Sequence, residues 1–244
     1  MKDGNFFRRL GDLALQVTNN LDAGEVSTLL AEAAHLCGAD AAAFASFVKD
    51  DEAYDSYRFI LACDPRWCLE YEQSAYYMDD PWLEYSRLHS EATLAQQIPA
   101  RSSMQLDVVA LAHRYGFASA IVMPAQSPQG LTRLGALCLG SAQPGRFDED
   151  ALAAVSVAVS ALVVRLHAWQ IAQLRGELLM RTRLSDEDLA LLIQERKGRS
   201  SKEIASLTNT TAQGINSRWQ RLNAKLGVSS RATAAQLAAE YGLI

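Results

Sequence analysis

The sequence predicts an α/β N-terminal domain, with an antiparallel sheet layered between helices, followed by an all-α domain of four short helices. Three observations lead to this fold class. The chain has 244 residues, which suits two domains better than one. Its 49% hydrophobic and 21% charged residues are typical of a folded globular protein. Strand-like and helical patterns alternate in the first part of the chain, and only helical patterns follow.

The chain is expected to begin with a helical region, followed by two strands. Apolar residues between Asn5 and Cys37 recur at mixed i+3 and i+4 spacing, which predicts helical structure. The runs Ala41–Val48 and Tyr57–Ala62 indicate strands, and the polar sequence Lys49-Asp-Asp-Glu between them indicates a turn.

The middle of this domain is expected to be helical. Trp67–Tyr77 is rich in aromatic residues and indicates a helix. Asp80-Pro81 indicates the start of another, because Asp is a good N-cap and Pro fits the first turn. A further helix is expected over Asp107–Tyr115, with Gly116 ending it.

A strand hairpin and a long helix complete the domain. Ala118–Met123 and Leu134–Gly140 are apolar runs on either side of the turn Ser127-Pro-Gln-Gly. A helix is then expected from Phe147 to about Arg175, with an apolar stripe along one face.

We expect the domain boundary just after this long helix. Residues 1–174 form the first domain, 175–183 a linker and 184–244 the second domain. The helices expected in the second domain are Asp186–Gln194, Ser201–Leu207, Thr211–Leu226 and Arg231–Tyr241.

Charge is distributed unevenly along the chain. The formal net charge of −5 argues against a protein that binds nucleic acid with its whole surface. However, residues 175–244 contain 11 Lys/Arg and 7 Asp/Glu, a net charge of +4, whereas residues 1–174 contain 12 and 21, a net charge of −9. A basic C-terminal part on an acidic body is the pattern of a local nucleic-acid footprint.

The sequence favours a cytoplasmic protein with no membrane partner. No stretch approaches the roughly 18 uninterrupted apolar residues of a membrane helix. The best candidate, Ala151–Ala161, is short and consists of small residues. The charged N-terminus is not followed by an apolar segment, so no secretory signal is visible.

Neither a metal site, a cofactor nor catalysis is expected. The cysteines and histidines show no CxxC pair and no metal-ligand spacing, so buried reduced thiols are favoured. A hydrolase is disfavoured because Gly-x-Ser-x-Gly is missing, and a response regulator because no phospho-acceptor Asp with an acidic cluster is apparent. The residues considered are Cys37, Cys63, Cys68, Cys138, His35, His89, His113 and His167.

The C-terminal domain contains the pattern of a helix-turn-helix. A short helix from Ser201, a polar turn at Asn209–Gln213 and a longer helix from Gly214 follow one another. The longer helix has a buried apolar face, and its other faces carry Asn, Gln, Arg and Lys, which can read base edges and hold phosphates. An ordinary solvated face remains the alternative. The residues expected to contact DNA are Ser201, Lys202, Thr211, Gln213, Asn216, Ser217, Arg218, Gln220, Arg221 and Lys225.

Two runs in this region resemble the DNA-binding domain of LuxR-type regulators. They are Lys197-Gly-Arg-Ser-Ser-Lys-Glu-Ile-Ala and Arg221-Leu-Asn-Ala-Lys-Leu-Gly-Val-Ser-Ser-Arg. The family commonly has Thr-Val where this chain has Gly214-Ile215, and His or Lys where it has Arg218. The resemblance therefore implies double-stranded DNA as partner, with an operator unlike the familiar ones and pseudo-palindromic for a homodimer.

The N-terminal domain resembles the acyl-homoserine-lactone-binding domain of LuxR-type quorum-sensing receptors. Trp67-Cys-Leu-Glu-Tyr71 and Asp80-Pro81 match that family's Trp-x3-Tyr and Asp-Pro signature. The resemblance implies that Trp67 donates to the lactone carbonyl, that Asp80 accepts from the ligand amide N–H, and that Tyr71 lines the acyl side. Alternatively, Trp67 and Tyr71 are plain core and Asp80 is only a helix cap.

The chain departs from this family at several pocket positions. By spacing, Cys63 replaces a Tyr, Ala95 a Trp, Ala120 a Gly and Cys138 a Ser or Thr. We therefore hypothesise a pocket that is wider and less polar at one end, for a ligand with an unusual acyl or aryl group or for one that is not a homoserine lactone. The residues expected to bind this small-molecule signal are Trp67, Tyr71, Asp80, Tyr57, Cys63, Ala95, Val122 and Cys138.

The expected mechanism couples ligand binding to folding and dimerisation. A buried ligand would complete the core of the first domain and stabilise it by mass action. The long helix would pair with its copy and place two recognition helices on a two-fold symmetric site. The main alternative is a LuxR-type regulator that is ligand-independent or controlled by a protein partner.

Overall fold

The computed structural model describes residues 4–49, 55–125, 127–128 and 130–244, and the chain divides into two compact units. Of the described residues, the first unit contains 4–47, 57–125, 127 and 134–169, and the second contains 48–49, 55–56, 128, 130–133 and 170–244. Lys49-Asp-Asp-Glu and Ser127-Pro-Gln-Gly, expected as turns, fall partly outside the described residues.

A five-stranded sheet in the order β2-β1-β5-β4-β3 forms the centre of the first unit. Strands β1 and β4 pair with β5 in antiparallel register, so Ala43 and Val122 both lie opposite Cys138. The hairpin expected from the sequence is thus confirmed. The strands are β1 (Ala41–Lys49), β2 (Asp55–Ala62), β3 (Thr93–Leu94), β4 (Ser119–Ala125) and β5 (Leu134–Ser141).

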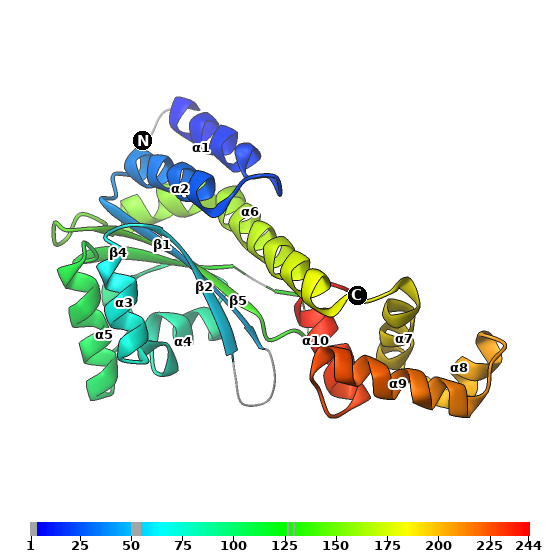
Figure 1. Ribbon diagram of the computed structural model, residues 1–244. Helices are drawn as coiled ribbons and strands as arrows, with labels where there is room; N and C mark the ends of the chain where they lie inside the picture. Colours follow the sequence, from blue (N-terminus) through cyan, green and yellow to red (C-terminus); the bar gives the residue numbers. More distant parts are fainter. Residues whose placement is uncertain (1–3, 50–54, 126, 129) are drawn as a thin grey trace. The chain divides into compact units, whose positions relative to one another are not determined.

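Helices cover both faces of this sheet, as Figure 1 shows. Helices α1, α2 and α6 lie over one face and α3, α4 and α5 over the other. The predicted α/β class is therefore confirmed for this unit. The helices are α1 (Gly4–Gln16), α2 (Ala23–Cys37), α3 (Arg66–Gln73), α4 (Pro81–Leu88), α5 (Ser103–Arg114) and α6 (Glu149–Thr182).

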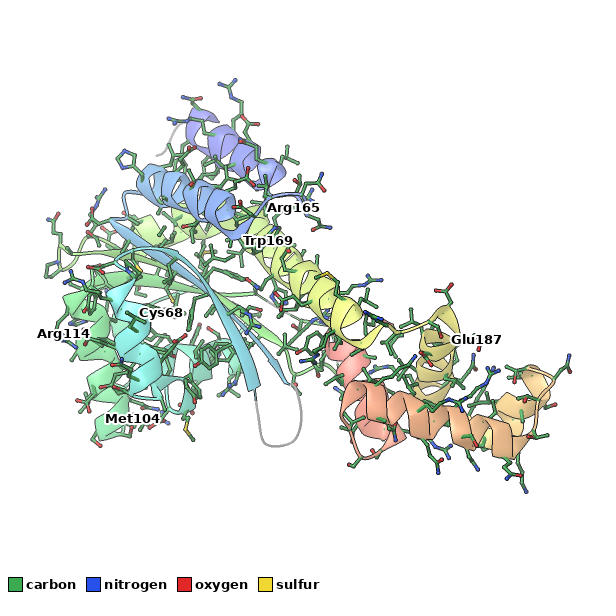
Figure 2. The ribbon with its side chains drawn as sticks, viewed as in Figure 1. Cys68, Met104, Arg114, Arg165, Trp169 and Glu187 are labelled. Carbon is green, nitrogen blue, oxygen red and sulfur yellow. The ribbon has the colours of Figure 1, made fainter. Side chains whose placement is uncertain are left out.

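Strand alternation divides the core into two layers. Ala42 and Phe44 of β1 pack with α1, α2 and α6, whereas Ala41 and Ala43 pack with the aromatic residues of α3 and α4. Successive side chains of a strand point to opposite faces, so one apolar strand serves both layers. Arg114 of α5, labelled in Figure 2, forms an ion pair of 2.8 Å with Glu70 and ties α5 to α3.

The helix expected over Trp67–Tyr77 is two elements. Helix α3 ends at Gln73, and a 3-10 turn, η1, covers Tyr76–Met78. Between them Ala75 adopts a left-handed conformation, with φ of 50°, which stops the helix. A second 3-10 turn, η2 (Ala95–Gln97), and the short β3 were not expected from the sequence, because two or three residues show no periodicity.

Helix α6 is longer than expected. The sequence placed its end near Arg175 and a linker at residues 175–183, but the helix continues to Thr182. Leu174 and Leu178 are buried in the core of the second unit, and this burial maintains the helix past Gly176. By length and composition alone α6 could cross a membrane, but this evidence is weak because core helices of soluble proteins pass the same test.

The second unit contains four short helices after α6. Helix α8 has the bounds expected, and the other three differ from the expected bounds by at most two residues. Ser185, Ser200, Thr211 and Ser230 cap the four helices by accepting backbone N–H groups. The helices are α7 (Asp186–Arg196), α8 (Ser201–Leu207), α9 (Ala212–Leu226) and α10 (Arg231–Glu240).

Candidate functional site

A cavity lies between the sheet and the helices α3 and α4 of the first unit. The space not filled by atoms is about 400 Å³, a volume that includes the opening to solvent. Eleven residues line it: Ala43, Ala45, Phe59, Trp67, Tyr71, Asp80, Trp82, Leu83, Phe117, Ala136 and Cys138.

Small and large side chains create this cavity. The strands β1 and β5 contribute Ala43, Ala45 and Ala136, which leave space above the sheet. Trp67 and Tyr71 lie one helical turn apart on α3, and their rings stack with centroids 5.0 Å apart. The Phe59 ring meets both edge-on, at 5.5 Å and 5.6 Å. The result is an apolar aromatic chamber.

Asp80 is the only acidic residue among those that line the cavity, and its exposed fraction is 8%. It is the N-cap of α4, and its Oδ1 accepts the backbone N–H groups of Trp82 (2.7 Å) and Leu83 (3.3 Å). Burial raises the pKa of the Asp80 carboxyl above its ordinary value, while its hydrogen bonds and the more distant Arg87 oppose that rise. No Lys or Arg among the described residues forms an ion pair with it.

The Tyr71 hydroxyl donates to Oδ2 of Asp80 at 2.7 Å. Burial and the Asp80 charge raise the pKa of Tyr71 well above its ordinary value, so this hydroxyl stays protonated. A carboxylate has about four acceptor positions. Three are used here, which leaves one position on Oδ2 for a donor from a bound molecule.

Trp82 lines the same cavity and is 6% exposed. Its indole N–H is buried and makes no hydrogen bond to any described residue. Trp82, Phe59 and Phe117 were not among the residues expected from the sequence to bind ligand. The position of Trp82 directly after Asp80-Pro81 was a usable signal, because a residue in the first turn of α4 stays close to its N-cap.

The structure brings together half of the residues expected to bind ligand. Trp67, Tyr71, Asp80 and Cys138 line the cavity, and the other four do not. Cys63 and Ala95 pack at the edge of the same aromatic core, Val122 is fully buried in β4, and Tyr57 stacks on Tyr77 at 4.7 Å.

The hypothesis of a wider pocket receives no support from this lining. Neither Cys63 nor Ala95 borders the cavity, so their small side chains do not enlarge it. Instead, Phe59, Trp82 and Phe117 take up space around it.

Burial keeps the thiols near this cavity protonated. It raises the pKa of Cys63 to about 11, that of Cys68 to about 12, and that of Cys138 further still. A thiolate is the form that attacks electrophiles and binds metals, so these thiols are poor nucleophiles. Within the described part of the chain, no three His, Cys, Asp or Glu side chains gather in a way that could hold a metal ion.

The second unit presents the polar face of α9. The apolar residues of this helix, Ile215, Trp219 and Leu222, are buried. Its polar residues Gln213, Gln220 and Arg221 are exposed. Thr211 is the N-cap of α9, and Ser217 donates to the backbone oxygen of Gln213. Ser201 and Lys202 form the first turn of α8. All ten residues expected to contact DNA thus lie on α8, on α9 or at the cap of α9.

Several of these side chains have partners within the unit. Arg218 pairs with Glu187 of α7 at 3.1 Å, and Figure 2 labels Glu187. Lys225 pairs with Asp188 at 2.6 Å. Asn216 accepts hydrogen bonds from Ser201 and from Arg231, a residue that the sequence analysis did not select.

Comparison with known proteins adds to this geometry. The model of the autoinducer-binding domain family matches residues 22–168, more than half of the chain, and all eleven residues that line the cavity lie inside the match. The chain belongs to the autoinducer-binding domain family. The search of curated proteins finds no match.

Solved structures share the fold of the chain. A structure titled as SdiA in complex with octanoyl-rac-glycerol has a TM-score of 0.70 at 17% identity, over 100% of this chain and 98% of that one. Escherichia coli SdiA gives 0.72 at 17% identity, over 98% and 99%. CepR2 from Burkholderia cenocepacia, titled as an N-acylhomoserine-lactone-dependent LuxR-family transcription factor, gives 0.57 at 14% identity, over 67% and 95%. At these identities the likeness shows the fold alone.

Proposed function

We propose that this protein is a ligand-responsive, sequence-specific DNA-binding transcription regulator of the LuxR quorum-sensing type. Its first unit would bind an acyl- or aryl-homoserine lactone or a related small molecule. The observation that carries the proposal is the buried Asp80 carboxylate, which keeps one free acceptor position in an aromatic cavity.

This free position favours a ligand with an N–H group. A buried polar group without a hydrogen-bond partner costs about 1–3 kcal/mol of free energy. A ligand N–H that donates to Asp80 therefore gains a partner on burial, and so does the free acceptor position of Asp80. The surrounding aromatic rings suit an acyl chain or an aryl group, because burial of apolar surface drives binding. CepR2 is described as dependent on N-acylhomoserine lactones, which contain an amide N–H.

The polar face of α9 supports the DNA-binding part of the proposal. Helix α8, a short turn and α9 follow the order of a helix-turn-helix motif, in which the second helix reads the major groove. Exposed Gln213, Gln220 and Arg221 can contact base edges or phosphates. The net charge of +4 over residues 175–244 favours attraction to the phosphate backbone.

An exposed apolar face on α6 supports a homodimer. Ala153, Val157, Ala161, Val164 and Ala168 are exposed and follow one another at i+3 and i+4 spacing, and Val157 and Val164 are 69% and 66% exposed. We propose that a second copy covers this face, since a two-fold interface packs one patch against itself. A two-fold dimer also matches a pseudo-palindromic operator.

One observation favours the alternative of a regulator controlled by a protein partner. The Tyr71 hydroxyl already donates to Oδ2 of Asp80 without any ligand. In addition, the side chains of Phe59, Trp82 and Phe117 take up space around the cavity. Such a domain can be stable when empty, as a regulator without a small-molecule signal requires.

Thermal melting of the full chain against acyl- and aryl-homoserine lactones tests the proposal. A ligand at about 100 times its Kd should raise the melting temperature by roughly 5–10 °C. Asp80→Ser keeps a cap oxygen but removes the ligand's acceptor, so it should abolish the rise. Asp22→Ser makes the same change at the exposed N-cap of α2 and should leave the rise intact. No rise with any lactone, in wild-type protein that binds DNA, would favour control by a partner.

A further inference from the structure

We propose that Trp82 is a second polar contact for the ligand, and that the ligand carries an oxygen acceptor close to its amide N–H. This inference rests on the proposed function and specifies the class of ligand. It makes Trp82 a specificity-determining residue, through an indole N–H that the folded protein leaves without a partner.

The position of Trp82 is fixed by Asp80. The carboxylate accepts the backbone N–H of Trp82 at 2.7 Å and so holds the first turn of α4 beside the cavity. The Trp82 ring packs with its centroid 6.3 Å from that of Phe117 and lines the same cavity as Asp80. A molecule that donates to Asp80 therefore lies within reach of this indole.

The unpaired N–H carries the chemical argument. An indole nitrogen can only donate, and buried tryptophans usually find an acceptor. Near Trp82 the oxygens of Asp80 already serve two backbone groups and Tyr71. A carbonyl or hydroxyl oxygen of the ligand can accept the indole N–H while all three hydrogen bonds to Asp80 remain in place. In a trans amide the carbonyl oxygen points away from the side of the N–H, so the amide itself does not offer this acceptor. A 3-oxo or 3-hydroxy substituent of an N-acyl chain, or an oxygen on an aroyl group, can lie on the N–H side.

A matched pair of probes tests this inference on the full chain. N-(3-oxooctanoyl)-homoserine lactone and N-octanoyl-homoserine lactone differ only at the 3-position, where one carries the oxygen. Trp82→Phe removes the indole N–H and reduces the size of the side chain while it retains an aromatic ring. Wild-type protein should bind the 3-oxo probe more tightly. In Trp82→Phe this preference should fall by about tenfold, with affinity for the octanoyl probe little changed. Trp169→Phe, which removes an indole that donates to Leu21, is the matched control and should keep the preference.

The outcomes separate this inference from the proposed function. If wild type binds either probe and Trp82→Phe weakens both equally, Trp82 only packs and the inference is wrong. An unchanged preference in Trp82→Phe also overturns it. If wild-type protein binds neither these nor any other lactone, the proposed ligand class fails as a whole, and the inference fails with it.

The second unit independently carries another inference. We infer that Asn216 reads DNA only as a hydrogen-bond donor, because Arg231 and Ser201 occupy its carbonyl oxygen. Oδ1 accepts from Ser201 Oγ at 2.8 Å and from Arg231 Nη2 at 2.9 Å. A guanidinium cannot accept a hydrogen bond, so its partner must be the oxygen, and the amide group of Asn216 is left to face outward.

Arg231 is held in place for this role. Its guanidinium lies 5.6 Å from the centroid of the Trp219 ring, and its Nη1 donates to Ser201 Oγ at 2.7 Å. A free Asn carboxamide reads adenine through one acceptor and one donor. With its acceptor occupied, Asn216 should favour guanine, whose N7 and O6 are both acceptors, over adenine, where the N6 amino group beside N7 would meet no acceptor. This inference rests on the proposed DNA binding.

Selection of duplexes from a random pool tests it. Comparison of wild type with Asn216→Ala identifies the base that Asn216 contacts, and that base should be guanine. Ser201→Ala combined with Arg231→Leu frees Oδ1 and should move the preference toward adenine. An adenine already selected by wild type, or identical selection by Asn216→Ala, would contradict the inference. If wild type selects no sequence, the proposed function itself fails.

Discussion

At the scale of single residues, the buried Asp80 has two opposed effects on the protein. Its oxygens cap α4 and accept from Tyr71, which stabilises the fold. The same burial raises the pKa of its carboxyl, so the ionised form is costly in the empty cavity. This combination of a helix cap with a costly buried charge is consistent with the proposed binding role of Asp80.

This shift predicts how stability depends on pH. The folded state holds the Asp80 proton more tightly than the unfolded chain, where the pKa is about 3.9. The stabilising contribution is therefore present below pH 4 and is lost as pH rises through the folded-state pKa. Asn caps a helix as well as Asp does. The melting temperature of Asp80→Asn should therefore exceed that of wild type by a difference that grows as pH rises from about 4 to 7. Melting curves across this range measure the difference, and a difference that does not change with pH would contradict the argument.

At the scale of elements, β5 depends on two positions without side chains. A Cβ at Gly140 would clash with Phe117 Cδ1 and would lie 2.7 Å from the backbone oxygen of Gly116. A Cβ at Gly135 would lie 2.6 Å from His167 Nδ1. The lack of a side chain at Gly140 and Gly135 lets Phe117 and α6 approach opposite faces of β5. Phe117 also lines the cavity.

Gly140→Ala should therefore destabilise the first unit by about 1–3 kcal/mol, because backbone must move as well as a side chain. Gly11→Ala is the matched control, since a Cβ there meets nothing within 4 Å in the middle of α1. It should stabilise the protein by about 0.5–1 kcal/mol. Denaturant unfolding measures both changes, and equal effects of the same sign would refute the packing argument.

The pairing of α7 with α9 gives a second prediction at this scale. Glu187 is 74% exposed and pairs with Arg218, so the pair adds at most about 1 kcal/mol to stability. Arg218→Ala should weaken binding to a non-specific 30-base-pair duplex and reduce the slope of log K against log salt by about 1. Glu187→Gln releases Arg218 and should strengthen binding several-fold with no loss of stability. Weaker binding in Glu187→Gln would show that the pair positions Arg218 for DNA.

At the scale of the whole molecule, substitutions on the exposed apolar face of α6 test the proposed homodimer. Val164→Glu places a charge in the middle of the exposed α6 face and should shift a homodimer to monomer. Leu15→Glu changes an equally exposed apolar residue on α1, at 66%, and should leave the dimer intact. Light scattering after gel filtration distinguishes the two. A wild-type monomer at all concentrations would remove the dimer from the proposal.

Local patterns in the sequence were sufficient for most elements and for the centre of the cavity. Periodic apolar residues and capping residues predicted the hairpin, the long helix and all four C-terminal helices, because these signals act over a few residues. The resemblance of Trp67, Tyr71 and Asp80 to a family signature placed these three side chains in one site, and all three line the cavity.

Only the tertiary structure decided which other residues meet there. Cys63 and Ala95, expected from spacing, lie at the edge, while Phe59, Trp82 and Phe117 line the cavity from three separate segments. Strand pairing and the packing of helices on the sheet set these distances, and both depend on contacts between residues far apart in the chain. The end of α6 was missed for the same reason, because the burial of Leu174 and Leu178 depends on the helices that follow. The sequence by itself determined the elements and the chemistry of Asp80; tertiary packing determined the walls around it and the unpaired indole of Trp82.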